Sequence, residues 1–237
     1  RVDDYHFEKL ALLANWSGVE RWKTVQPVEF SLEKLDLGFE VNNIVASITL
    51  PKASAITKPS VRLEKFSAGV FGGQLFLPEP ALWDFGAPIN TLTLRAQQWQ
   101  LSDMVALQQD KDIQASGMLE GELPVTLDDG RIVIQKGYLR ALPPGGSIHY
   151  SRNDASRTLG EKSTEVALAL DLLSDFQYQV LSSTVDLDKA GNLQLGLSLA
   201  GHNPTLYDGR PVNFNINLEQ NLDPLLQSLR LSDKLVK

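Results

Sequence analysis

The segment Gly117–Gly146, GMLEGELPVTLDDGRIVIQKGYLRALPPGG, contains two runs in which apolar and polar residues alternate. In the first run, apolar residues or glycine occupy every odd position from 113 to 127, and in the second run the phase changes near Lys136-Gly137. A period of two is typical of a strand with two chemically different faces. Asp129-Gly130 between the runs favours a tight hairpin turn. The segment therefore predicts two long antiparallel strands.

The same alternation recurs over most of the chain, at 28–50, 61–77, 89–99, 185–199 and 212–218. Within the first of these stretches, Asn42-Asn43 predicts the turn between two strands. Gly72-Gly73 marks either a hairpin turn or a bend within one long strand. No sequence repeat of fixed length accompanies the pattern. Consecutive strands of this kind predict an extended antiparallel sheet with few helices.

Helical spacing is confined to three short parts of the chain. Residues 102–107 favour a short helix, Ser163 is a suitable N-cap for a helix that reaches residue 181, and a terminal helix is expected at 223–235. The polar segment 151–162 has no pattern and is expected to be a loop. We expect residues 28–237 to form one β domain, preceded by a lead-in segment over 1–27 for which a helix is one option.

Composition and charge exclude several classes of protein. The 237 residues carry a formal net charge of -7, and Lys and Arg never cluster beyond a pair, so the footprint of a nucleic-acid-binding protein is missing. The absence of cysteine excludes disulfides, thiolate metal sites and cysteine nucleophiles. No apolar stretch approaches the roughly 18 residues of a membrane span, and the first residues lack the features of a signal peptide. We therefore expect any targeting segment to lie outside this sequence.

Residue types that carry out catalysis are few and scattered. The three histidines, His6, His149 and His202, do not lie at metal-ligand spacing, and no GxSxG nucleophile motif is present. Local structure explains most carboxylates, such as Asp128-Asp129 in the expected hairpin turn. We expect no enzyme activity, no metal and no cofactor. A hydrolase assembled from residues distant in sequence stays open as an alternative.

The alternating apolar rows have two interpretations. In a closed sandwich, each apolar face is half of a core. In a sheet curled into an open trough, the apolar row lines a surface on which acyl chains can lie, because acyl chains need apolar area and no hydrogen bonds. Each buried CH₂ group contributes about 0.8 kcal/mol. A uniform row would therefore hold a two-chain lipid firmly and still allow it to slide.

Three separated motifs carry a resemblance to a known family. They are ASGMLEGELPVTLDDGRIVIQKGYLRALPPGGSIHY from residue 115, LSDFQYQVLSSTVDLDKAGNLQLGLSLAGHNP from residue 173, and GRPVNFNINLEQNLDPLLQSLRLSDKL from residue 209. In this order they resemble the C-terminal region of the YdbH family, AsmA-like intermembrane phospholipid transport proteins of Gram-negative bacteria that carry the older label dicarboxylate transport. The resemblance extends over residues 28–237.

The resemblance implies a mainly β fold in which long antiparallel strands curl into an open, repeating β-groove, or β-taco, with about two to four packed helices. It implies a periplasmic protein that is anchored in the inner membrane outside this sequence and passes phospholipid between the inner and outer membranes. The implied partner is a small outer-membrane lipoprotein of the YnbE type, which adds strands near the C-terminal end. The alternative is a scaffold that docks such a lipoprotein, or serves envelope assembly, without carrying lipid.

The residues expected to line the groove are apolar members of the alternating rows. They are Leu119, Leu123, Val125, Ile132, Ile134, Leu195, Leu197, Phe214 and Ile216. Sequence alone does not fix which face of each strand is inside. Some of these side chains are expected to be plain core, because the helices must also pack on apolar sheet.

Overall fold

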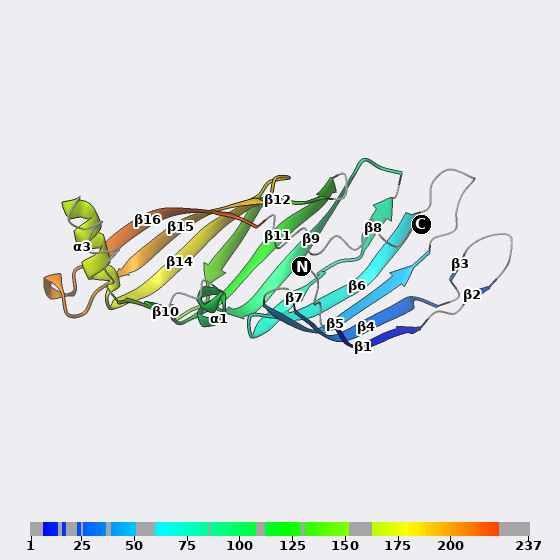
Figure 1. Ribbon diagram of the computed structural model, residues 1–237, viewed down its shortest axis with the longest axis horizontal. Coiled ribbons are helices and arrows are strands. Elements are labelled where there is room, and N and C mark those ends of the chain that lie inside the picture. The colour runs from blue at the N-terminus through cyan, green and yellow to red at the C-terminus, as the bar shows by residue number, and fades with distance from the viewer. Residues whose placement is uncertain are drawn as a thin grey trace, which may run out of the picture.

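In the computed structural model the chain forms one large antiparallel sheet (Figure 1). The structure describes residues 7–13, 16–17, 23–24, 26–36, 39–50, 60–84, 86–107, 112–128, 131–151 and 163–222. The strands of the main sheet follow one another in sequence order: β1 (Phe7–Leu13), β4 (Val28–Asp36), β5 (Glu40–Thr49), β6 (Ser60–Val70), β7 (Gly73–Phe76), β9 (Ile89–Gln100), β11 (Met118–Asp128), β12 (Arg131–Ala141), β14 (Phe176–Leu187), β15 (Asn192–His202) and β16 (Val212–Asn221). The sheet is therefore a meander.

Shorter strands complete the sheet at its margins. They are β8 (Ala81–Asp84), which pairs with β6, and β10 (Ile113–Ala115) and β13 (Gly146–Tyr150), which pair with each other beside β14. Two further strands, β2 (Trp16–Ser17) and β3 (Lys23–Thr24), form a separate hairpin. β1 and β16 lie at opposite ends of the strand order and do not pair, so the sheet stays open rather than closing into a barrel. This confirms the mainly β, open antiparallel fold expected from the sequence.

The strand pair predicted by the opening segment is β11 and β12. Asp128 pairs with Arg131, so two residues connect the strands, as a tight hairpin requires. The pairing shifts register opposite Lys136, which adopts a positive φ of 57°. Lys136 is therefore a bulge, and it keeps Ile134 and Leu139 on the same face although one number is even and the other odd.

The predicted run from residue 113 to 127 is interrupted between β10 and β11. Gly117 has a φ of 122° at this break. Tyr178 of β14 is 2% exposed, and its Oη donates a hydrogen bond to the carbonyl oxygen of Ser116 over 2.6 Å. A Cβ atom on Gly117 or Gly146 would clash with this hydroxyl group. The break follows from close packing around Tyr178, which alternation in the sequence does not reveal.

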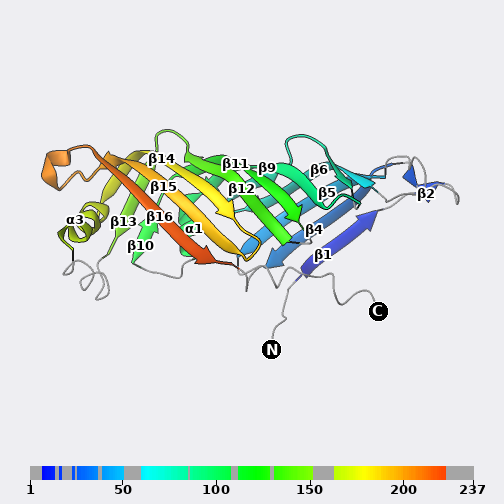
Figure 2. The same cartoon turned by 90° about the horizontal axis from the view of Figure 1, so that it is seen from above.

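Bulges recur across the sheet. Register shifts occur between β5 and β6, β9 and β11, β11 and β12, β12 and β14, and β14 and β15. Asn43 and Gln98, like Lys136, have positive φ angles at these shifts. Because a bulge bends its strand and increases the local twist, their repetition favours a curled sheet over a flat one. The oblique strands of Figures 1 and 2 are consistent with this twist.

Two predicted turns have different outcomes. Gly72-Gly73 belongs to a hairpin, since Val70 pairs with Gly73 and both Phe71 and Gly72 have positive φ. The turn predicted at Asn42-Asn43 is wrong, because both residues lie inside β5 and the connection falls between Asp36 and Glu40. Asparagine tolerates positive φ in turns and bulges alike, so this signal did not distinguish the two.

The described part of the chain contains two α-helices, α1 (Leu101–Ala106) and α3 (Thr164–Leu173), and a 3-10 turn, η1 (Tyr207–Gly209). α3 begins as predicted, with Ser163 Oγ accepting a hydrogen bond from the Val166 amide at 3.3 Å. Its predicted end at residue 181 is wrong, because β14 starts at Phe176 and its residues alternate between buried and exposed. The helix predicted at 223–235 and most of the loop predicted at 151–162 lie outside the described residues.

The lead-in segment also departs from one expectation. Residues 7–13 form β1, which pairs antiparallel with β4, so the helical option is wrong over this stretch. A short apolar run is compatible with either element by pattern, and pairing with the edge of β4 decides in favour of the strand. The division of the chain between residues 27 and 28 stays a prediction.

Removing the Tyr178 hydroxyl tests its role at the break between β10 and β11. We expect Tyr178→Phe to lower the free energy of unfolding by about 0.5–1.5 kcal/mol, because the Ser116 carbonyl loses the hydrogen bond that the Tyr178 hydroxyl donates. Denaturant unfolding measures this change. Tyr138→Phe, at a side chain that is 39% exposed, is the matched control and should leave the free energy almost unchanged. Equal effects of the two substitutions would contradict the assignment.

Alkaline pH gives a second test of the same group. Burial raises the pKa of Tyr178 from 10.0 to about 12. A raised pKa in the folded state means that the stabilisation is complete below pH 10 and is lost as the pH rises toward 12. Unfolding measured over this pH range should therefore show a steeper loss of stability in the native protein than in Tyr178→Phe. Parallel pH profiles for the two proteins would count against this origin.

Candidate functional site

The apolar side chains of the sheet gather on one face, from β4 to β16, which we call the inner face. Its buried part comprises Leu32, Val41, Ile44, Ala68, Val70, Ala96, Trp99, Leu119, Leu123, Leu139, Phe176, Tyr178, Leu181, Val185 and Leu199. Half-buried apolar residues of β4, β6, β7, β11, β12, β13, β15 and β16 pack around this cluster. The inner face is therefore one continuous apolar surface, built by alternation and kept in phase by the bulges.

Seven of the nine residues predicted to line the groove belong to this cluster or pack against it, and alternation along β12 and β15 puts the other two, Ile132 and Leu197, on the same side. Leu119 and Leu123 are buried, with 2% and 8% of their side chains exposed, and they form its floor. The other seven are half-buried, or exposed in the case of Ile132: Val125, Ile132, Ile134, Leu195, Leu197, Phe214 and Ile216. Cross-strand pairs bring Val125 together with Ile134, and Leu197 together with Ile216. Their contact with a ligand stays a prediction.

The inner face becomes more accessible toward its C-terminal end. On β14, Leu181 and Val185 are 5% and 6% exposed, whereas Leu218 on β16 is 47% exposed. Among the described residues, α1 packs mainly on β9 and β10 and α3 mainly on β13, and Leu101, Met104 and Leu173 of these helices contact the buried cluster. The apolar residues of β15 and β16 are thus paired within the sheet but only partly covered, which is the arrangement of a surface that can receive an apolar ligand.

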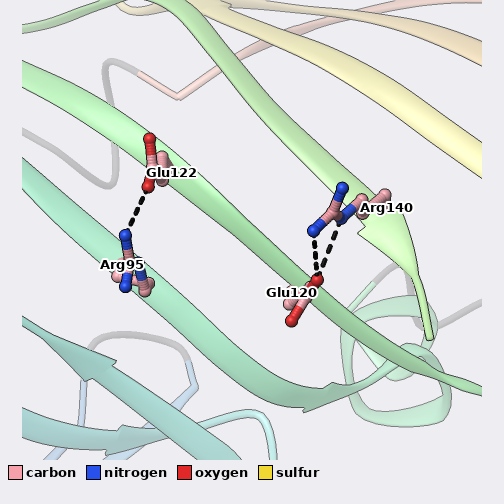
Figure 3. A network of polar contacts seen from close by, with 4 residues as sticks. All are labelled: Arg95, Glu120, Glu122 and Arg140. Atoms are coloured by element: carbon pink, nitrogen blue, oxygen red, sulfur yellow. Dashed lines mark hydrogen bonds and ion pairs between the residues drawn. The ribbon is translucent and has the colours of Figure 1, made fainter.

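The opposite, outer face is polar. In the centre of the sheet, Arg95 on β9 contacts Glu122 on β11 over 2.7 Å, and Arg140 on β12 contacts Glu120 over 2.7 Å (Figure 3). The hydrogen bond that each arginine donates to its glutamate raises the pKa of the arginine, so both guanidinium groups stay charged. Exposed pairs of this kind contribute little stability. Their placement instead marks this face as the one that water covers.

The described residues contain no group of three or more His, Asp or Glu side chains that could hold a metal ion. The carboxylate of Asp188 is occupied within its own turn by the amides of Ala190 and Asn192. None of the helices in this part is long and apolar enough to cross a membrane. The feature with a chemical use is the apolar inner face.

The predicted set of groove residues omitted the N-terminal half of the inner face. Phe30 and Leu32 on β4 and Phe66 and Ala68 on β6 belong to the same surface as the residues of β11 to β16. The alternation at 28–50 and 61–77 carried this signal. Pairing each strand with the next in sequence would have joined these residues to the predicted set.

Comparison with known proteins agrees with this geometry. The family model described as Intermembrane phospholipid transport protein YdbH matches residues 2–237. A curated relative from Escherichia coli (strain K12), named Probable phospholipid transport protein YdbH, is 23% identical over 173 residues, which cover 73% of this chain and 19% of that protein. The chain thus spans about a fifth of the length of that relative. No solved structure matches. With the family model matching nearly the whole chain, the protein belongs to the YdbH-like family of intermembrane phospholipid transport proteins.

Proposed function

We propose that the inner face carries phospholipid by holding its acyl chains while the headgroup stays in water. The observation that carries this proposal is one apolar surface, continuous over the strands from β4 to β16, that the described helices leave partly uncovered at β15 and β16. A surface that served only as a protein core would be covered by a second layer of the same chain. Membership of a phospholipid transport family supports the choice of ligand.

The energetics of such a surface suit transport better than storage. Burying each CH₂ group of an acyl chain contributes about 0.8 kcal/mol, wherever along the row it is buried. The exposed or half-buried residues Ile132, Leu197 and Ile216 offer side chains of similar size and no fixed hydrogen-bonding partner. Neighbouring positions of the lipid therefore differ little in free energy, and the barrier to sliding along the inner face is low.

We further propose that the whole protein bridges the periplasm of a Gram-negative bacterium, anchored in the inner membrane by a segment outside this sequence. The support is the family and the shape of the sheet, whose strands succeed one another along the long axis of the molecule (Figure 1). A meander can be extended by further strands without changing its cross-section, so an apolar inner face can continue over a long distance.

A second proposal concerns docking at β16, the last strand in the order. β16 pairs over ten residues with β15 and has no register shift and no internal proline. The β16 residues that lie on the outer face include Asn213, Asn215 and Asn217. None of these is a lysine, the residue that commonly protects a sheet edge. We propose that a small outer-membrane lipoprotein of the YnbE type adds a strand here. A scaffold that docks this partner without carrying lipid is the alternative function.

The lipid proposal is tested by mass spectrometry of lipids that co-purify with the protein. We expect acyl lipid with the native protein and about tenfold less with Ile216→Asp, because a carboxylate on the inner face must be desolvated against acyl chains. Asn217→Asp places the same charge on the outer face of the same strand and should retain the lipid. A native protein free of lipid, or equal loss in the two variants, would leave the scaffold as the better account.

The docking proposal is tested with the lipoprotein partner and two lysine variants. Asn213→Lys combined with Asn217→Lys places charges along the β16 edge and should abolish capture of the lipoprotein, since edge lysines oppose strand addition. Gln194→Lys on β15, one strand further in, should leave capture intact. Lipid content should be unchanged in both proteins. Normal capture by the doubly substituted protein would rule out docking at this edge.

A further inference from the structure

One end of the molecule carries α3 and the loop 203–211, which contains η1. Figures 1 and 2, at right angles to each other, both place these two segments together at one extreme of the long axis. We call α3 and this loop the tip. The tip adjoins β15 and β16, because its loop connects the end of β15 to the start of β16.

The tip exposes apolar side chains in an arrangement that its own fold does not use. The C-terminal half of α3 is anchored, with Leu172 only 4% exposed, whereas Val166 and Leu168 are 39% and 40% exposed. Val166 and Leu168 lie two residues apart and thus on opposite sides of the helix, so no single contact with the sheet could bury both. Tyr207 of the loop is 57% exposed. The first turns of α3 therefore expose apolar side chains on two opposite sides of the helix, beside the polar Thr164 and Glu165.

Asn203 joins the two segments of the tip into one unit. Its side chain is fully buried, and its Nδ2 donates hydrogen bonds to the carbonyl oxygens of Asp171 and Leu172 at the end of α3, over 3.4 and 3.0 Å. Its Oδ1 accepts from the amides of Thr205 and Leu206, over 2.9 and 3.1 Å. α3 and the loop carrying Tyr207 are thus held in a fixed relation, since a buried and fully bonded amide is costly to displace.

The apolar surface of the tip is continuous with the inner face. Leu173, the last residue of α3, packs against the buried cluster. Three residues further on, the ring of Phe176 packs edge to face on that of Phe214, with centroids 5.2 Å apart. An apolar path therefore runs from the accessible strands β15 and β16 to the exposed side chains of α3.

We infer that the tip inserts its apolar side chains into the interfacial region of a phospholipid bilayer, so that the end of the inner face meets the membrane. This inference rests on the proposed function, because a surface that carries acyl chains must load or unload them at a bilayer. A short helix with apolar side chains and a nearby tyrosine suits the boundary between headgroups and acyl chains.

The charges of the tip define the kind of bilayer. Its ionisable side chains include Glu165, Asp171 and Asp208, against Arg210, and the whole chain carries a formal net charge of -7. The described residues of the tip thus carry more negative than positive charge, which disfavours attraction to anionic lipid as the source of binding. The tip binds a bilayer of zwitterionic phospholipid. Its binding is insensitive to salt because the contact is apolar.

Flotation with vesicles of phosphatidylethanolamine and phosphatidylcholine tests this inference on the whole chain. We expect the native protein to float with the vesicles, and Val166→Asp combined with Leu168→Asp to bind about tenfold more weakly, because carboxylates cannot enter the interface. Val45→Asp combined with Leu82→Asp is the matched control. These two side chains are 43% and 57% exposed on β5 and β8, far from the tip, and their variant should float as the native protein does.

The outcomes separate this inference from the proposed function. Ile216→Asp should lose co-purified lipid and keep vesicle binding, whereas the α3 variant should keep its lipid and lose vesicle binding. Failure of the native protein to float, equal flotation of the α3 variant and the control, or binding that requires anionic lipid and disappears in salt would each overturn the inference. In those cases the tip contacts a protein or nothing, and the lipid-carrying inner face is unaffected.

Discussion

In the described part of the chain, an open meander has to bury one face of its sheet without a second sheet of comparable size to cover it. The rest of the structure depends on this constraint. In a sandwich, two apolar faces cover each other at a spacing of about 10 Å. In the described residues, α1 and α3 add side chains to the buried cluster, and the floor of the inner face is buried at Leu119, Leu123 and Leu139. Of the apolar side chains described on β15 and β16, Leu199 is buried and the others are only partly covered. Incomplete burial is a cost to stability in an ordinary domain, and in this one it leaves the surface that a ligand can use.

Curvature depends on a small set of backbone irregularities. Asn43, Gln98 and Lys136 each occupy a positive φ angle at a register shift. Each shift changes the apolar row between odd and even numbers without moving it to the other face. Tyr178 adds a different device, since its buried hydroxyl ties the strand break at Ser116 to β14. Removing the bulges would flatten the sheet and also send half of each apolar row to the polar face.

Much of this fold could be predicted from the sequence, because period-two alternation reports directly on a sheet with two different faces. The strands, the hairpin at Asp129-Gly130 and the change of phase at Lys136 all follow from local pattern. The wrong predictions share a cause, because a local sequence pattern carries no information about which strand a segment will pair with. Asn42-Asn43 suits a turn or a bulge, and the apolar residues after Leu173 suit a helix or a strand. The pairing of β5 with β6 and of β14 with β15 decides between these options.

The same limit applies to the candidate site. The sequence specified which residues share a row, whereas the side of the sheet they occupy and their exposure depended on curvature, which is a property of all the strands together.

Under the proposed function, the uniformity that would let lipid slide along the inner face would also prevent this face from directing the movement. Where every position holds an acyl chain with nearly the same free energy, net transport must come from the two ends, through differences in how lipid enters and leaves. The ends of the sheet are therefore where the chemistry must change, and in this chain it does change. Toward β16 the inner face becomes accessible, the edge strand carries asparagines in place of protective lysines, and α3 presents apolar side chains to the exterior.

A strand added at β16 would lengthen the apolar path, while a bilayer at the tip would end it. The two contacts use different surfaces, the strand edge and α3, so the geometry allows a docked partner and a membrane to be engaged at the same end.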